Sequence, residues 1–214
     1  MRHTAAPRTR SPGTLKPIAV GLLVVTAAII GTLVYQSTSS PAPSFSEVRH
    51  SHHGGATAEV DGAVTRADGV LPDGVTVFDD RYPGVANLDP ALLAALRLAA
   101  ADAADDGVEF VVDSGWRSRE YQEQLLHEAV SEYGSVQEAA RWVATPDTSA
   151  HVAGEAVDIG PVDATAWLSE HGATYGLCQI YSNEPWHYEV RPEAVADGCP
   201  PMYADPTHDP RMQQ

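Results

Sequence analysis

An uncharged, mostly apolar run from Ile18 to Tyr35 limits where a soluble fold can form in this chain of 214 residues. As an α-helix, its 18 residues would extend about 27 Å, close to the thickness of a bilayer's hydrocarbon core. Basic residues precede the run and acidic ones do not, so the positive-inside rule predicts a cytoplasmic basic tail at residues 1–17. We therefore expect residues 18–35 to be a transmembrane anchor and every later residue to be exported.

A cleaved signal peptide is the alternative interpretation of the same run. A signal peptide has the same charged start, but its apolar region is usually about 7 to 15 residues long and ends at a small-residue cleavage site. The length favours the anchor, whereas the small residues from Pro41 to Ser44 keep cleavage open. The predicted localisation is the cell membrane, single-pass with an extracytoplasmic C-terminal domain, or secretion after cleavage.

The charge of the chain is strongly uneven. Four of its 13 basic residues precede Glu47, so nine arginines accompany all 29 acidic residues in the rest of the chain, a net charge of about −20 there. Nucleic-acid binding depends on lysine and arginine displacing counterions from phosphates. The composition therefore excludes nucleic acid as a partner.

Residues 36–69 have the composition of a flexible linker. They are rich in Ser, Pro, Gly, Ala and His and show no apolar periodicity that could build a core. His50, His52 and His53 form a small cluster that could bind a metal ion weakly, but a histidine tract without supporting residues is more often solvated chain. We expect the folded part to begin near Val70.

Residues 70–202 carry the patterns of one folded domain. Four stretches show helical spacing of apolar residues behind a capping residue: 90–104 after Asp89, 118–133 from Ser118, 135–143 from Ser135 with Glu138 in a capping box, and 163–172 from Asp163. Four β-prone runs cover 108–112, 156–159, 175–181 and 186–190. Helices come first and strands later, so the expected fold class is α+β rather than a parallel sheet.

Cys178 and Cys199 are the only cysteines of the chain. An exported compartment permits them to pair, which would stabilise the fold by about 3 kcal/mol through lost entropy of the unfolded chain. Two buried free thiols are the alternative. We expect the disulfide.

Two short segments contain the residue types of a catalytic metal site. His151 and Asp158 lie seven residues apart, with Gly154 between them where the chain can bend from a loop into a strand. His187 follows downstream, with Glu184 three residues before it. A catalytic zinc ion takes three ligands of these types and keeps one position open for water, whose proton a nearby carboxylate can remove. Singly, each of these residues is more often structural, so the prediction rests on their combination.

These residues resemble the VanY-type D-alanyl-D-alanine carboxypeptidases, in the group of zinc peptidases that also holds lysostaphin-like enzymes and hedgehog domains (the LAS-type peptidases). The resemblance covers roughly residues 70–202 and includes the pattern Ser-x-His-x-x-Gly-x-Ala-x-Asp followed by Glu-x-Trp-His. It implies that His151, Asp158 and His187 bind one zinc ion and that Glu184 is the general base. It also implies a small antiparallel sheet that carries the zinc site, flanked by helices.

An arginine upstream extends the resemblance. The sequence Ser-Gly-Trp-Arg-Ser at residues 114–118 is similar to the family's Ser-Gly-Tyr-Arg-Ser, with Trp116 in place of tyrosine. The resemblance implies that Arg117 binds the peptide and stabilises the oxyanion, a task that suits the planar fork of a guanidinium. Ser149 and Gln122 are further candidates for polar contacts with the substrate.

The activity implied by the resemblance is zinc-dependent removal of the terminal D-Ala from peptidoglycan stem peptides, by residues 70–202 as a carboxypeptidase domain. L,D-carboxypeptidase, D,D-dipeptidase and endopeptidase activities on wall peptides share the same metal chemistry and stay open. A non-catalytic, zinc-containing wall-binding module is a third alternative, but it would need neither Glu184 nor Arg117. His127, His171 and His208 have no partner at ligand spacing, and the sequence does not reveal the role of a C-terminal tail at residues 203–214.

Overall fold

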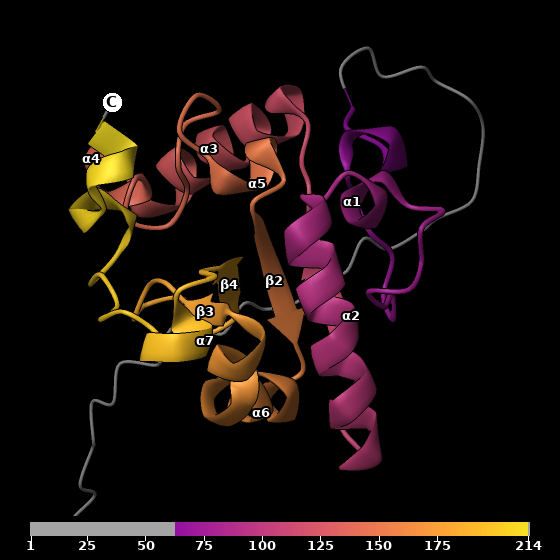
Figure 1. Cartoon of the computed structure of the whole chain (residues 1–214). Helices are drawn as coiled ribbons and strands as arrows, with labels where there is room; N and C mark the ends of the chain where they lie inside the picture. Colours follow the sequence, from indigo (N-terminus) through magenta and orange to yellow (C-terminus); the bar gives the residue numbers. More distant parts are fainter. Residues whose placement is uncertain (1–62, 214) are drawn as a thin grey trace, which may run out of the picture. The chain divides into compact units, whose positions relative to one another are not determined.

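The structure is a computed structural model and describes residues 63–213 (Figure 1). The expected basic tail, the apolar run 18–35 and most of the expected linker, including its three histidines, lie outside the described residues. Within the described part, no helix is long and apolar enough to cross a membrane. The anchor therefore stays a prediction.

A four-stranded antiparallel sheet forms the centre of the described domain. Its strands are β1 (Val111–Ser114), β2 (Ala156–Gly160), β3 (Leu177–Gln179) and β4 (His187–Val190), in the order β1-β2-β4-β3. Asp158 on β2 pairs with Ser114 on β1 and with His187 on β4. This register brings residues from three distant motifs into one row across the sheet, and it confirms the expected α+β class.

Helices cover the sheet and supply much of the core. They are α1 (Pro83–Ala86), α2 (Pro90–Asp105), α3 (Arg119–Tyr133), α4 (Val136–Ala139), α5 (Ala150–Ala153), α6 (Val162–His171) and α7 (Ala194–Asp197). Figure 1 shows α5 above one end of β2, α6 below the other end and α2 along its side. Leu92 and Leu96 of α2 are fully buried in one cluster with Val157 and Ile159 of β2, so burial of this apolar face fixes the helix on the sheet.

Local sequence signals place several of these elements well. Asp89 caps α2 by accepting hydrogen bonds from the N–H groups of Ala91 (2.8 Å) and Leu92 (3.2 Å), as expected. Ser118 likewise caps α3 by accepting from Tyr121 N at 3.1 Å. Both helices follow apolar spacing behind a strong cap, which is why their starts are predictable.

Other boundaries differ from expectation. Helix α4 ends at Ala139 instead of 143, although Ser135 does cap it. Pro161, not Asp163, occupies the N-cap of α6; Asp163 lies in the first turn, where its carboxylate accepts from the next N–H group. Strand β1 lies three residues later than predicted at its start, and β3 begins only at Leu177 because residues 172–175 form a 3-10 turn.

The domain is larger at both ends than residues 70–202. A 3-10 turn at Arg66–Asp68 is closed by a capping box from Thr65, and the carbonyl oxygen of Asp68 accepts a hydrogen bond from Ser118 N at 2.8 Å. At the other end, Tyr203 O accepts a hydrogen bond from Ser182 N at 2.9 Å. Tyr203 begins a segment that docks on the domain and contains 3-10 turns at Pro206–His208 and Pro210–Gln213. Residues 203–213 are thus part of the fold, not a separate tail.

Cys178 and Cys199 form the expected disulfide, with an S–S distance of 2.00 Å. The bond joins the buried strand β3 to the segment after α7, across 21 positions of sequence. The alternative of two free thiols is therefore wrong.

Cys199→Ser is expected to lower the free energy of unfolding by about 3 kcal/mol, because the unfolded chain regains the entropy of an open loop of this length. Urea denaturation of the variant and of the oxidised wild-type chain measures the difference. Reduced wild type should match the variant, and equal stability of the oxidised wild type and Cys199→Ser would contradict the prediction.

Candidate metal centre

The segment that carries two of the predicted ligands turns sharply at Gly154. This glycine has a φ of +78°, and a methyl group on it would lie 2.5 Å from the carbonyl oxygen of Asn87. Its own carbonyl oxygen accepts a hydrogen bond from Asp89 N at 2.8 Å. The start of α2 therefore fixes the corner between α5, which carries His151, and β2, which carries Asp158.

Three buried side chains converge from α5, β2 and β4. His151 Nε2 lies 3.4 Å from Asp158 Oδ1, His187 Nδ1 lies 3.3 Å from the same oxygen, and the two ring nitrogens are 3.2 Å apart. All three residues are less than 9% exposed. The one-turn helix α5 was not expected from the sequence, but the structure brings together the three predicted ligands.

The three facing atoms are all of types that bind metal ions. His151 Nδ1 lies 2.8 Å from Gly115 O and can only donate to it, which leaves Nε2 with a lone pair. His187 Nε2 lies 3.3 Å from a carboxylate oxygen of Glu189, to which its N–H donates, so Nδ1 is the nitrogen that offers a lone pair to a metal ion once its own proton has left. Asp158 Oδ1 is buried without a hydrogen-bond partner. The space between these three atoms suits a positive charge, which is either a proton on Nδ1 of His187 or a metal ion that replaces it.

The spacing fits a small tetrahedral ion. Bonds of about 2.0 Å in tetrahedral geometry place ligand atoms about 3.3 Å apart, and the three observed separations are 3.2, 3.3 and 3.4 Å. Two imidazoles and one carboxylate are also the donor set of a catalytic zinc site. Residues His151, Asp158 and His187 therefore fit one zinc ion.

Protonation states agree with this donor set. Burial raises the pKa of Asp158, but the neighbouring histidines and Arg117 outweigh burial and hold the pKa well below its usual value, so this ligand is ionised. Burial also lowers the pKa of His187, but hydrogen bonds with Asp158 and Glu189 raise it to about 9. A metal ion therefore competes with a proton at Nδ1 of His187.

Glu184 lies beside the three ligands, and one of its two carboxylate oxygens has no hydrogen-bond partner. Its Oε2 is 3.6 Å from His187 Nδ1, and its Oε1 is buried without a hydrogen-bond partner. Burial raises the pKa of Glu184 to about 7, against the attraction of His187. A carboxylate with such a pKa can both take and return a proton near neutral pH.

Arg117 orients the carboxylate of Asp158 from the side opposite the ligand atoms. Its terminal NH2 group donates to Asp158 Oδ2 at 2.8 Å, its Nε donates to Ser114 Oγ at 2.8 Å, and NH1 donates to Gln122 Oε1 at 3.2 Å. Because Oδ2 is held by the arginine, Oδ1 is directed at the two histidines. Arg117 is thus part of the hydrogen-bond network that supports the metal centre.

The two weaker candidates for substrate contact have structural partners. Gln122 is 1% exposed, and besides accepting from Arg117 it donates through Nε2 to Ala144 O at 2.9 Å. Ser149 caps α5, where its Oγ accepts from Val152 N at 3.4 Å. The structure therefore explains both residues as supports of Arg117 and of the helix that carries His151.

Arg117→Lys is expected to lower kcat/KM by about 10- to 100-fold, because an ammonium cannot make the three hydrogen bonds of the guanidinium fork. Initial rates with the wall peptides that the sequence resemblance implies as substrates check this. Arg119→Lys is the matched control, since Arg119 is exposed and contacts Asp147 and the carbonyl oxygen of Pro146, away from the three ligands. Equal losses in the two variants would contradict a specific role of Arg117.

Sequence reasoning missed the support of His187. Glu189 follows His187 by two positions on β4, so both side chains share one face of the strand, a periodicity that could have revealed the pair. The carboxylate of Glu189 also accepts hydrogen bonds from Arg211, which lies on the docked C-terminal segment. Nothing in the local sequence around Arg211 signals this contact.

The fold and the site together define a class: an α+β domain with a buried mononuclear metal centre of the metallohydrolase type, with a carboxylate beside its ligands. A family model described as "VanY: D-alanyl-D-alanine carboxypeptidase" matches residues 86–193, half of the chain. The chain belongs to this family.

Individual relatives match parts of the chain. A D-alanyl-D-alanine carboxypeptidase of Enterococcus faecalis (strain ATCC 700802 / V583) is 39% identical in an alignment that covers 39% of this chain and 40% of the relative. This chain thus spans less than half the length of that curated relative. A solved structure of VanYB in complex with D-Alanine-D-Alanine is 33% identical, with coverage of 51% and 75% and a TM-score of 0.48. A mutant of the vancomycin resistance D,D-pentapeptidase VanY in complex with Zn(II) is 31% identical, with coverage of 48% and 72% and a TM-score of 0.46.

Proposed function

We propose that the chain is a zinc-dependent D-alanyl-D-alanine carboxypeptidase that hydrolyses the terminal D-Ala of peptidoglycan stem peptides. The observation that carries this proposal is the set of three buried atoms of metal-binding types at tetrahedral spacing, next to a carboxylate with an unpartnered oxygen. Membership of the VanY family supports the reaction and the substrate class.

His151, Asp158 and His187 would hold the ion in this scheme. The chemistry supplied by a bound zinc ion is a water whose pKa falls towards neutrality. Glu184 would take a proton through its free oxygen from the water that adds to the carbonyl carbon of the terminal peptide bond. The bond between that carbonyl carbon and the amide nitrogen then breaks, and Glu184 returns the proton to the leaving amine of D-alanine.

Arg117 has donors left for the substrate. Three of its five N–H groups bond to Ser114, Gln122 and Asp158, which leaves two others unused among the contacts of the described residues. A guanidinium with free N–H groups beside the centre can stabilise the negative charge that develops on the attacked carbonyl oxygen. Its bond to Asp158 fixes the guanidinium in advance, so this stabilisation requires little reorganisation.

Mass spectrometry of the products tests the proposed bond specificity. The purified full-length chain, incubated with zinc and a stem pentapeptide ending in D-Ala-D-Ala, should yield free D-alanine and the tetrapeptide. Release of the intact D-Ala-D-Ala dipeptide would identify a D,D-dipeptidase instead. Cleavage of only the tetrapeptide or of only cross-linked peptides would identify an L,D-carboxypeptidase or an endopeptidase, and each of these outcomes would overturn the D,D-carboxypeptidase proposal.

We also propose that residues 18–35 hold the domain at the outer side of the membrane, where its substrate is found. The charge asymmetry around this run supports the proposal, and so does the disulfide, since disulfides persist in exported compartments. Protease digestion of intact cells and of separated membranes tests the location. The chain should fractionate with the membranes and be digested from outside, and recovery in the medium would favour cleavage.

A further inference from the structure

The proton on Nε2 of His187 is controlled by a buried carboxylate that the scheme above does not use. Glu189 lies two residues after His187 on β4, is 1% exposed, and places Oε1 at 3.3 Å from Nε2. The carboxylate accepts a hydrogen bond from Nε2 and so fixes the ring with Nδ1 directed at Asp158 and His151. If the carboxylate turned away, the ring would lose the contact that keeps Nδ1 directed at the other two ligands.

Two arginines contact the carboxylate of Glu189, but in different ways. Arg191 contacts only Oε2, at 2.6 Å. Arg211 contacts both oxygens, with NH1 at 2.7 Å from Oε2 and NH2 at 3.2 Å from Oε1. A bidentate fork fixes the plane of a carboxylate, whereas a single contact does not. Arg211 therefore determines how Glu189 faces the imidazole.

Arg211 is itself held by a buried partner. Its Nε donates to Asp209 Oδ2 at 2.9 Å, and Asp209 is fully buried. The second partner of Asp209 is Tyr181, whose hydroxyl group donates to Oδ2 at 3.0 Å and whose ring lies 5.1 Å from the ring of His187. Glu189, Arg211, Asp209 and Tyr181 thus form a closed network of contacts that begins and ends at His187.

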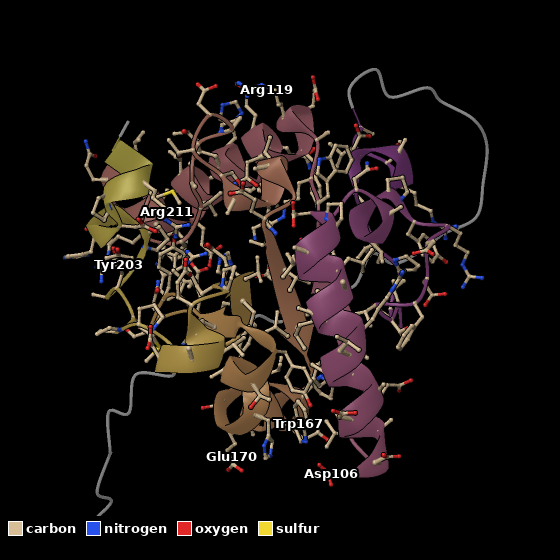
Figure 2. All side chains as sticks on the ribbon, viewed as in Figure 1. Asp106, Arg119, Trp167, Glu170, Tyr203 and Arg211 are labelled. Carbon is tan, nitrogen blue, oxygen red and sulfur yellow. A yellow bond between two sulfur atoms is a disulfide. The ribbon has the colours of Figure 1, made fainter. Side chains whose placement is uncertain are left out.

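The charges of the two carboxylates and the two arginines around this network balance. Glu189 and Asp209 contribute two negative charges, and Arg191 and Arg211 contribute two positive ones. Removing Arg211 would leave two buried carboxylates with one arginine, and no bidentate contact would then fix the plane of the Glu189 carboxylate. Figure 2 shows Arg211 on the C-terminal segment, on the side that faces the sheet.

We propose that Arg211 is a positioning residue of the metal centre, which acts through Glu189 to hold His187 in the tautomer and orientation that metal binding requires. The docked segment 203–213 is then a functional part of the centre. The inference rests on the metal centre of the proposed function, and not on which bond that centre hydrolyses.

Zinc affinity of the full-length chain tests the proposal, measured by competition with a chromophoric chelator. Arg211→Gln should bind Zn²⁺ about 10- to 100-fold more weakly than wild type, the usual effect of losing a residue that supports a metal ligand. Arg141→Gln is the matched control. It removes the 3.1 Å contact between Arg141 and Asp205 that holds the same segment, without touching Glu189 or Asp209.

Affinity of Arg211→Gln within twofold of Arg141→Gln would overturn the proposal, because docking of the segment would then be all that matters. If Arg211→Gln does not fold, Arg211→Lys replaces it in the same measurement of zinc affinity. It keeps the charge but loses the fork, so zinc binding should weaken by a few-fold relative to Arg141→Gln, and equal affinity of these two variants would overturn the proposal.

Side-chain ¹⁵N NMR of His187 gives a readout that a purely structural role would not change. In the metal-free wild-type chain, at a pH above the His187 pKa of about 9, Nε2 should carry the proton of the neutral ring, and in Arg211→Gln a measurable fraction should move to Nδ1. Absence of D-alanine release together with zinc binding that depends on Arg211 would overturn the proposed function and leave this inference standing.

Discussion

Glu184→Gln is expected to abolish hydrolysis while the metal ion stays bound. The amide has nearly the same shape as the carboxylate but cannot take a proton, so kcat should fall by about 10³-fold or more. The structure places Glu184 beside the ligands, and its Oε1 has no hydrogen-bond partner. Initial rates of D-alanine release, measured together with zinc content, check both parts of the prediction.

Glu155→Gln is the matched control for this change. Glu155 lies in the same motif, between His151 and Asp158, but its side chain is exposed. It should hydrolyse peptide at the wild-type rate. If Glu184→Gln retained more than a tenth of the wild-type kcat with zinc bound, Glu184 would not be the general base.

His187→Ala is expected to have the largest effect on metal binding. The substitution removes one of three ligands and also leaves Asp158 and Glu189 without the imidazole that lies between them. Zinc affinity should therefore fall by more than the roughly 100-fold that changes behind the ligands produce. The stabilisation of the fold by added zinc, seen as a rise in Tm, should disappear with it.

Equilibrium dialysis with Zn²⁺ and thermal unfolding with and without the ion measure these effects. His127→Ala is the control, because His127 is exposed on α3, a helix that carries none of the three ligands. It should bind one zinc ion with wild-type affinity. A His187→Ala variant that still bound one ion tightly would refute the assignment of this ligand.

The parts of the fold that could be predicted are those set by local chemistry. The starts of α2 and α3 follow from Asp89 and Ser118, whose side chains bond to N–H groups two or three residues later. Strand β2 follows from an apolar run between glycines. The metal residues were predictable as a set because one ion dictates which residue types must meet, whatever fold brings them together.

The parts that could not be predicted depend on contacts distant in sequence. Gln122 looks like a surface residue of a helix, but Ala144 and Arg117 bury it. The segment after residue 202 has no apolar periodicity, and its polar contacts include those of Asp205 and Arg211 with partners at least 22 positions away. Neither pattern is visible until the sheet is assembled.

The most direct test of the zinc centre is the release of D-alanine by the full-length chain before and after zinc is restored. The chain is stripped with a chelator, and Zn²⁺ is then added in steps up to several equivalents. We predict no release from the stripped chain and a rate that rises linearly and saturates at one ion per chain. Release that survives stripping, or its absence after one zinc ion has bound, would contradict the account.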